Sequence, residues 1–212
     1  MTGAELYTQT TAILDGLEIE SVYFYQLLNI AKTKLEEQRL WQYLKKVNSA
    51  TTASSAAVDI GAYTDFAEEY KVMVGQDTEY TPVPFEEQQN FRNSSGHYYI
   101  DWANMNLYLL GATIPSKTLY IFYKRFTPDI ASGTSPVFPT RFHPILAYYV
   151  AAIYQTGTDS DDIFARMGPV NKQAAMELER AMKQWDSNIA LRAQDNRIGV
   201  ANSNNGIPLE LM

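Results

Sequence analysis

The chain has 212 residues, a net charge of −7, a pI of about 4.9 and no cysteine. This length suits one domain, or one domain with an inserted subdomain, and a hydrophobic fraction of 46% is enough to build a core. The acidic balance argues against nucleic-acid binding through phosphates, which needs clustered Lys and Arg, and the missing cysteines exclude disulfides and thiolate chemistry.

The beginning of the chain has neither the basic nor the apolar segment of a signal peptide, and no apolar run approaches the ~20 residues that cross a bilayer. We therefore expect a soluble protein that is made in the cytosol and makes no membrane contact.

Residues 1–57 predict an N-terminal helical hairpin. Apolar residues at helical spacing predict one helix over residues 3–15 and a longer one over about residues 20–47. The apolar side of the longer helix comprises Phe24, Leu27, Leu28, Ala31, Leu35, Trp41, Leu44 and Val47. Its polar face includes Lys32, and the small residues of the segment 49–57 are interpreted as the linker that leaves the hairpin.

Residues 58–138 predict a small β-rich insertion. Two short extended pieces, at 64–66 and 70–75, precede one helical turn that begins at Pro84. Three aromatic runs, at 98–102, 107–110 and 119–126, then have the composition of a small antiparallel meander.

Residues 139–195 predict the helices that complete a bundle. The segment 140–156 is apolar nearly all round, which is typical of a helix buried in a core or between subunits, and a last helix is expected over about 160–195. Residues 196–212 predict a flexible C-terminal arm with an apolar end. The predicted class is therefore α+β, mainly α: a bundle of about four helices, with a small antiparallel β subdomain inserted between the second and third helices, and an extended C-terminal arm.

The sequence contains no convincing catalytic or metal-binding pattern. Its two histidines, His97 and His143, both lie beside aromatic residues, where a structural role is expected. Asp159, Asp161 and Asp162 lack the glycine pattern of a calcium loop and are interpreted as helix caps. We predict that the protein is not an enzyme and uses no metal or other cofactor.

The order of three segments resembles the head–tail connector (adaptor) proteins of tailed bacteriophages. The first is the predicted helical segment from Ile19 to Leu44. The second is Thr51-Thr52-Ala53 followed by Tyr63-Thr64-Asp65-Phe66. The third joins Leu119-Tyr120-Ile121-Phe122-Tyr123 to Pro139-Thr140-Arg141-Phe142-His143-Pro144 through a proline-rich loop. Together they span roughly residues 5–155.

The resemblance implies a structural virion protein of the neck, made in the host cytoplasm. Its subunits would form a homo-oligomeric ring, a dodecamer, that docks under the portal protein, contacts a tail or neck completion protein and lines the DNA channel. An acidic chain suits such a channel, because genomic DNA passes it without specific binding. The expected portal-binding arm residues are Ile207, Leu209, Leu211 and Met212, and the expected subunit-interface residues are Tyr99, Trp102, Tyr108, Tyr120, Phe122 and Tyr148.

Two alternatives remain at this point. The chain could be another phage structural part, such as a tail-completion or baseplate component. It could also be a carbohydrate-binding module, since the exposed Tyr and Trp rings of the meander could stack on sugars.

Overall fold

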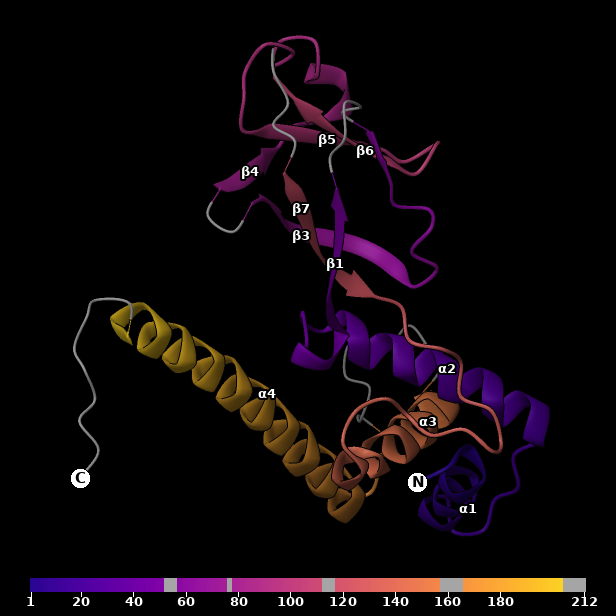
Figure 1. Cartoon of the computed structure of the whole chain (residues 1–212). Helices are drawn as coiled ribbons and strands as arrows, with labels where there is room; N and C mark the ends of the chain where they lie inside the picture. Colours follow the sequence, from indigo (N-terminus) through magenta and orange to yellow (C-terminus); the bar gives the residue numbers. More distant parts are fainter. Residues whose placement is uncertain (52–56, 76–77, 112–116, 157–165, 204–212) are drawn as a thin grey trace, which may run out of the picture. The chain divides into compact units, whose positions relative to one another are not determined.

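The computed structural model describes residues 1–51, 57–75, 78–111, 117–156 and 166–203, and the chain divides into two compact units (Figure 1). The helical unit combines Met1–Tyr43 with Pro128–Met212. The β unit is the continuous segment Leu44–Thr127 between them.

Helix α3 is the centre of the helical unit. The helices of this unit are α1 (Gly3–Ile13), α2 (Ser21–Glu37), α3 (Pro144–Thr156) and α4 (Pro169–Ser203), with a 3-10 turn η3 (Thr140–Phe142) before α3. Helix α3 packs against α1, α2 and α4, and eight of its 13 residues are buried. The prediction of a buried, apolar helix in this segment is confirmed.

Helix α2 ends ten residues before the sequence predicts. The indole of Trp41, which is fully buried, donates a hydrogen bond of 2.7 Å to the Leu35 carbonyl, one of the groups left unpaired at a helix end. A 3-10 turn η1 (Gln42–Leu44) follows, and residues Lys45–Thr51 form strand β1. The predicted helix over 20–47 is therefore wrong beyond Glu37, and Val47 lies on a strand.

The loop that follows the β unit is held by two side chains of α2. The Asn29 amide accepts a hydrogen bond from the Ile130 amide (2.8 Å) and donates one to the Ile130 carbonyl (3.3 Å). The Lys32 ammonium donates to the Pro128 carbonyl and to Asp129, both at 3.1 Å. Lys32 is buried, so its expected place on a solvated helix face is wrong: the loop supplies the oxygens that a buried ammonium requires.

Helix α4 is anchored by the buried carboxylate of Asp186. Its Oδ1 accepts a hydrogen bond of 2.6 Å from the Gln42 amide, and its Oδ2 lies 3.2 Å from the Arg39 guanidinium. The helix continues to Ser203, beyond the expected end near residue 195.

The β unit consists of β1 and six further strands. These are β2 (Ala57–Asp59), β3 (Phe66–Val74), β4 (Thr78–Pro82), β5 (His97–Asp101), β6 (Asn106–Leu110) and β7 (Thr118–Arg125). A 3-10 turn η2 (Phe85–Glu87) follows Pro84, as predicted.

The described strands form one curled, half-barrel sheet in the order β1-β7-β3-β4-β5-β6-β2. All neighbours are antiparallel except β4 and β5. The three aromatic runs do form strands, but they do not form a three-stranded meander. Only β5 and β6 pair with each other, whereas β7 pairs with β1 and β3, which precede it by many residues in the chain.

The expected fold class is wrong for this reason. The β part is a seven-stranded sheet with its own core, and the fold is mixed and dominated by this sheet rather than a helical bundle with a small β insert. A strand pairing between segments about 70 residues apart, such as β1 with β7, leaves no local signal in the sequence.

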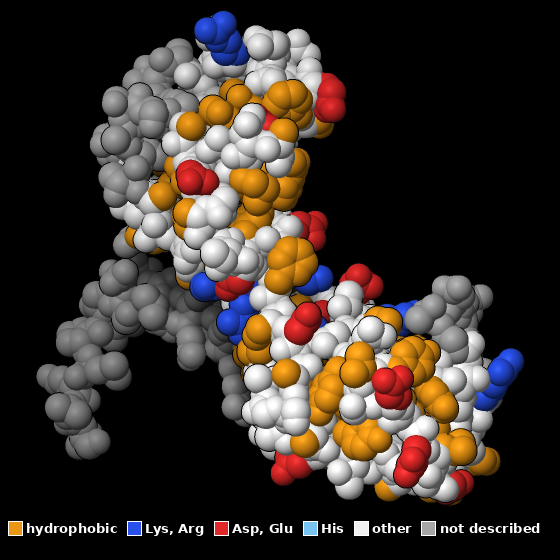
Figure 2. Space-filling view, turned by 90° about the vertical axis from the view of Figure 1, so that its right-hand side faces the viewer, with side chains coloured by type: hydrophobic (Ala, Val, Ile, Leu, Met, Phe, Trp, Pro, Cys, Tyr) orange, Lys and Arg blue, Asp and Glu red, His pale blue; other side chains and the backbone are white. Residues whose placement is uncertain are grey.

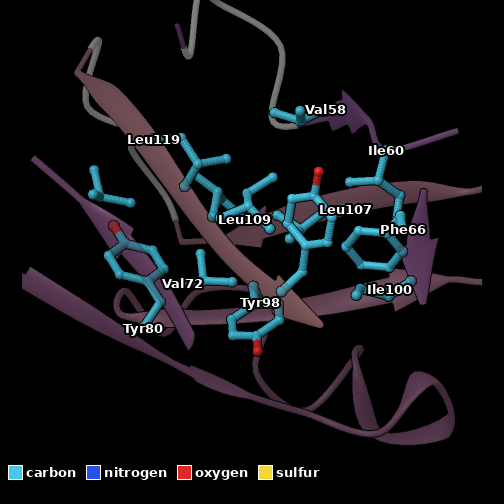
Figure 3. Close-up of a cluster of buried hydrophobic side chains, with 13 residues drawn as sticks. Val58, Ile60, Phe66, Val72, Tyr80, Tyr98, Ile100, Leu107, Leu109 and Leu119 are labelled. Carbon is cyan, nitrogen blue, oxygen red and sulfur yellow. The ribbon is translucent and has the colours of Figure 1, made fainter. Parts of the chain in front are cut away.

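The core of the β unit fills the concave side of the sheet (Figure 3). It contains Val58, Ile60, Phe66, Val72, Val74, Tyr80, Tyr98, Ile100, Leu107, Leu109, Leu119, Ile121 and Tyr123. The figure shows these side chains converging from several strands, so that burial of apolar surface stabilises the curled sheet.

A polar network lies beside this core and joins β1 to β7. The Tyr123 hydroxyl donates to Asp65 Oδ1 (2.9 Å) and accepts from the Asn48 amide (3.2 Å). Lys46 donates to Asp65 Oδ2 at 2.9 Å. Burial raises the pKa of Asp65, but the hydrogen bonds from Lys46 and Tyr123 outweigh it and lower the pKa below its usual range.

Candidate interaction surfaces

The described part of the chain contains no group of three or more His, Asp or Glu side chains arranged to hold a metal ion. Among the helices that the structure describes, none combines the length and apolar character required to cross a membrane. The features that stand out are instead surfaces on which apolar side chains are exposed to solvent. Figure 2 shows such side chains gathered on both units.

The first surface, which we call the α2 surface, lies on the helical unit. It is formed by Val22, Tyr23 and Ile30 of α2 and by Tyr154 at the end of α3. Val22 is 62% exposed and Tyr23 is 46% exposed, and the rings of Tyr23 and Tyr154 lie 6.4 Å apart. Val22 lies on the side of α2 away from its core residues Phe24, Leu27, Leu28, Ala31 and Leu35. Tyr23 and Ile30 lie beside this core stripe, where Tyr23 meets Tyr154 of α3.

The second surface, which we call the strand surface, is the convex face of β1, β7 and β3. Val47 lies opposite Phe122 in the β1–β7 pair and is 49% exposed. The rings of Tyr70 and Phe122 lie 6.3 Å apart, and the Lys45 ammonium lies 5.7 Å from the centre of the Tyr70 ring. Tyr120 continues the same row along β7, since its side chain points to the same face as Phe122.

A third group of aromatic rings lies on the outer side of β5 and β6. Tyr99 and Tyr108 are opposite each other in the strand pair and stack at 4.9 Å with an angle of 8° between the rings. Phe85 packs edge-on against Tyr99 at 5.8 Å. Trp102, which is 52% exposed, follows β5 and lies 6.1 Å from the core ring of Phe66.

The six expected interface residues therefore fall into separate groups. Tyr120 and Phe122 lie on the strand surface, and Tyr99 and Tyr108 stack on each other across β5 and β6. Trp102 lies in the turn after β5, against Phe66. Tyr148 belongs to α3 of the helical unit, where its side chain is half-buried. The arm residues Ile207, Leu209, Leu211 and Met212 lie outside the described residues.

Sequence reasoning missed the α2 surface and the contribution of Val47 and Tyr70. A signal for the α2 surface existed, because Val22, Tyr23 and Ile30 are apolar residues outside the core stripe of that helix. Val47 and Tyr70 could be placed only once the register of β1, β7 and β3 was known.

The two histidines serve the packing of their units. The buried ring of His143 donates from Nε2 to the Phe138 carbonyl (2.7 Å) and accepts at Nδ1 from the Met1 ammonium (2.8 Å). Burial lowers the pKa of His143, and the nearby ammonium lowers it further. His97 packs against Phe91, with ring centres 4.9 Å apart.

Comparison of the sequence with the models of known protein families gives no match, and comparison with curated proteins gives none either. The features of this chain that bear on its function are accordingly the surfaces described above and the order of segments along the chain.

Proposed function

We propose that this chain is a structural subunit of the head–tail connector of a tailed bacteriophage, assembled as a ring beneath the portal. The observation that carries the proposal is the presence of two separate apolar surfaces, one on each unit. A closed ring of identical subunits joins one surface of each subunit to a different surface of the next, so it requires such a pair. Contiguous exposed apolar side chains on a soluble chain mark sites of protein association.

The order of elements supports the same proposal. The segments that resemble connector proteins correspond to α2 with η1, to the passage that ends at the start of β3, and to β7 with η3 and the start of α3. The proline-rich loop between β7 and η3 is clamped by Asn29 and Lys32 of α2. The helix, loop and helix of the resemblance thus lie in one unit, whereas its extended segments lie in the β unit, which is larger than we expected.

In this proposal the ring is dodecameric, matches the portal, contacts a tail or neck completion protein, and surrounds the path of the genomic DNA. The negative net charge of the chain would keep DNA from adhering to the wall of the channel. The apolar arm end would bind the portal.

The decisive experiment mixes the full chain with its candidate portal protein and determines mass and negative-stain images. We expect a closed ring stacked on the portal, with or without ring formation by the free chain. A chain that stays monomeric and does not bind the portal would overturn the proposal.

A variant of the α2 surface sharpens this test. Val22→Glu places a charge in the proposed interface, where burial without a partner is unfavourable, so we expect the ring to be lost while the monomer keeps its helical content. Val22→Ala is the matched control, because it keeps the surface apolar and should still assemble. Normal rings from Val22→Glu would exclude the α2 surface from the interface.

A further inference from the structure

The β unit contains a pocket with a volume of about 290 Å³ that no step of the proposed assembly uses. It lies between β3, the segment that joins β4 to η2, and the end of β5. Its lining includes Glu69, Pro84, Phe85, Glu86, Tyr99 and Trp102. The volume is at the lower end of the range for small-molecule sites, about 300–1,000 Å³, and suits a single side chain.

A carboxylate without a full set of partners lies in this pocket. Glu69 Oε2 is out of contact with solvent and has no hydrogen-bond partner. Burial raises the pKa of Glu69, the charge of Glu68 raises it further, and a backbone hydrogen bond and the Tyr98 hydroxyl lower it. A buried acceptor that lacks a donor is unfavourable, so the pocket favours a ligand that supplies an N–H or O–H group.

The rest of the lining combines aromatic rings and a second carboxylate with the apolar side chains of Pro82, Val83, Pro84 and Ile100. Phe85 and Trp102 are each about half exposed, and Phe85 meets Tyr99 edge-on rather than forming a flat platform with it. Glu86 adds a second carboxylate, and the lining contains no Lys or Arg. Aromatic ring faces carry negative potential, so rings and carboxylates together select a cation.

From this juxtaposition we propose that the pocket binds an arginine side chain presented by a partner protein. The planar guanidinium stacks on aromatic rings and donates several hydrogen bonds in one plane, which matches the two kinds of group that line the pocket. The last torsion of a glutamate side chain is soft, so rotation of the Glu69 carboxylate brings either oxygen toward the guanidinium. Neither the ring nor the portal is needed for this binding.

The first test is a titration of the full chain with N-acetyl-arginine methylamide, followed by saturation-transfer NMR of the ligand. We expect saturable binding with a Kd on the order of 1 mM, as suits one side chain without the rest of its protein. The citrulline derivative has nearly the same shape without the charge, and we expect it to bind at least tenfold more weakly.

Variants locate the binding in the pocket. Glu69→Gln removes the carboxylate charge and should weaken arginine binding at least tenfold. Glu177→Gln is the matched control: it makes the same change at an exposed carboxylate of α4, which is not part of the pocket lining, and should leave the Kd unchanged. Trp102→Ala changes an exposed ring and should also weaken binding, which keeps the test decisive if Glu69→Gln fails to fold.

Several results would overturn the inference. These are no saturable binding of the arginine derivative, equal binding of the citrulline derivative, or a Kd that is unchanged in Glu69→Gln and Trp102→Ala. Saturable binding of methyl glucoside in place of the arginine derivative would also overturn it, and would identify the pocket as a carbohydrate site. Because the probe is a free amino-acid derivative, failure here leaves the ring proposal intact, and failure of the ring leaves this binding intact.

Discussion

The two units place their polar groups differently. In the helical unit, buried polar side chains join segments that are far apart in the chain: Asp186 of α4 holds the region after α2, and Lys32 of α2 holds the loop that returns from the β unit. In the β unit the interior is a cluster of apolar and aromatic side chains, and the network around Asp65 lies beside it.

The two units therefore differ in which interactions fix the packing of their elements. Helices that pack through apolar surfaces can slide against one another, and a few buried charged contacts fix one arrangement, as has been argued for buried polar groups in other proteins. In a sheet the register follows from the alternation of side chains between two faces. The helical unit should thus be sensitive to single polar changes, and the β unit more tolerant of them.

The largest effect is expected from Asp186→Ala. It removes a charge-assisted hydrogen bond and leaves the half-buried Gln42 amide and the Arg39 charge without this partner, so the free energy of unfolding should fall by about 3 kcal/mol. Hydrogen–deuterium exchange should show faster exchange in α4 and at the end of α2, and unchanged exchange in β3 and β7.

The matched control is Glu177→Ala, an exposed carboxylate on the same helix. We expect a change within about 0.5 kcal/mol, as for most surface substitutions. Equal effects of the two variants would show that the buried carboxylate has no special importance for the helical unit.

A smaller effect is expected from Tyr123→Phe in the β unit. The variant keeps the buried ring and removes a hydroxyl that donates to Asp65 and accepts from Asn48, which should cost roughly 1–2 kcal/mol. Urea unfolding of the variant measures this loss of stability, and hydrogen exchange in β7 shows whether it arises at the expected strand.

Lys46→Met provides the comparison, because Lys46 binds the same carboxylate from an exposed position. We expect a smaller loss of stability than in Tyr123→Phe, because solvent screens an exposed ion pair. A loss in Lys46→Met that exceeds the loss in Tyr123→Phe would reverse the ranking of buried and exposed partners.

The smallest effect is a pH dependence that arises from His143. Its folded-state pKa is lowered, chiefly by burial, so the unfolded chain binds the proton more readily. The stability of the helical unit should therefore fall as pH decreases through about 6.5, the ordinary histidine value, and level off below the lowered folded-state pKa. Urea unfolding followed by helical circular dichroism across this range measures it, and a slope of the same size in His143→Asn would contradict the assignment.

The sequence predicted elements whose signal is local. The spacing of apolar residues indicated α1 and α3, Pro84 and the acids after it indicated η2, and aromatic runs indicated β5, β6 and β7. It failed at β1, because Leu44 and Val47 are three residues apart and continue the helical pattern of α2. Helix α2 ends where the Trp41 indole binds the Leu35 carbonyl, and the segment of β1 is a strand because it pairs with β7.

The candidate surfaces were predictable only in part. The aromatic runs of the later strands suggested interface residues, and five of the six residues named lie in the β unit, but their exposure and grouping depend on the sheet register. The pocket was not predictable, because Glu69 reaches it only through the register of β3. In the sequence Glu68 and Glu69 are equivalent neighbours, whereas on the strand they point to opposite faces.

The pairing of Lys45 with Lys124 has a consequence for how this chain is made and how it can change. Because these two residues are partners across β1 and β7, the chain enters and leaves the β unit at adjacent positions. On the ribosome the β unit is complete once Arg125 has emerged, whereas the helical unit must wait for the segment after Pro128. Over evolutionary time the segment between these positions can be lengthened or exchanged while the helices on either side keep their course.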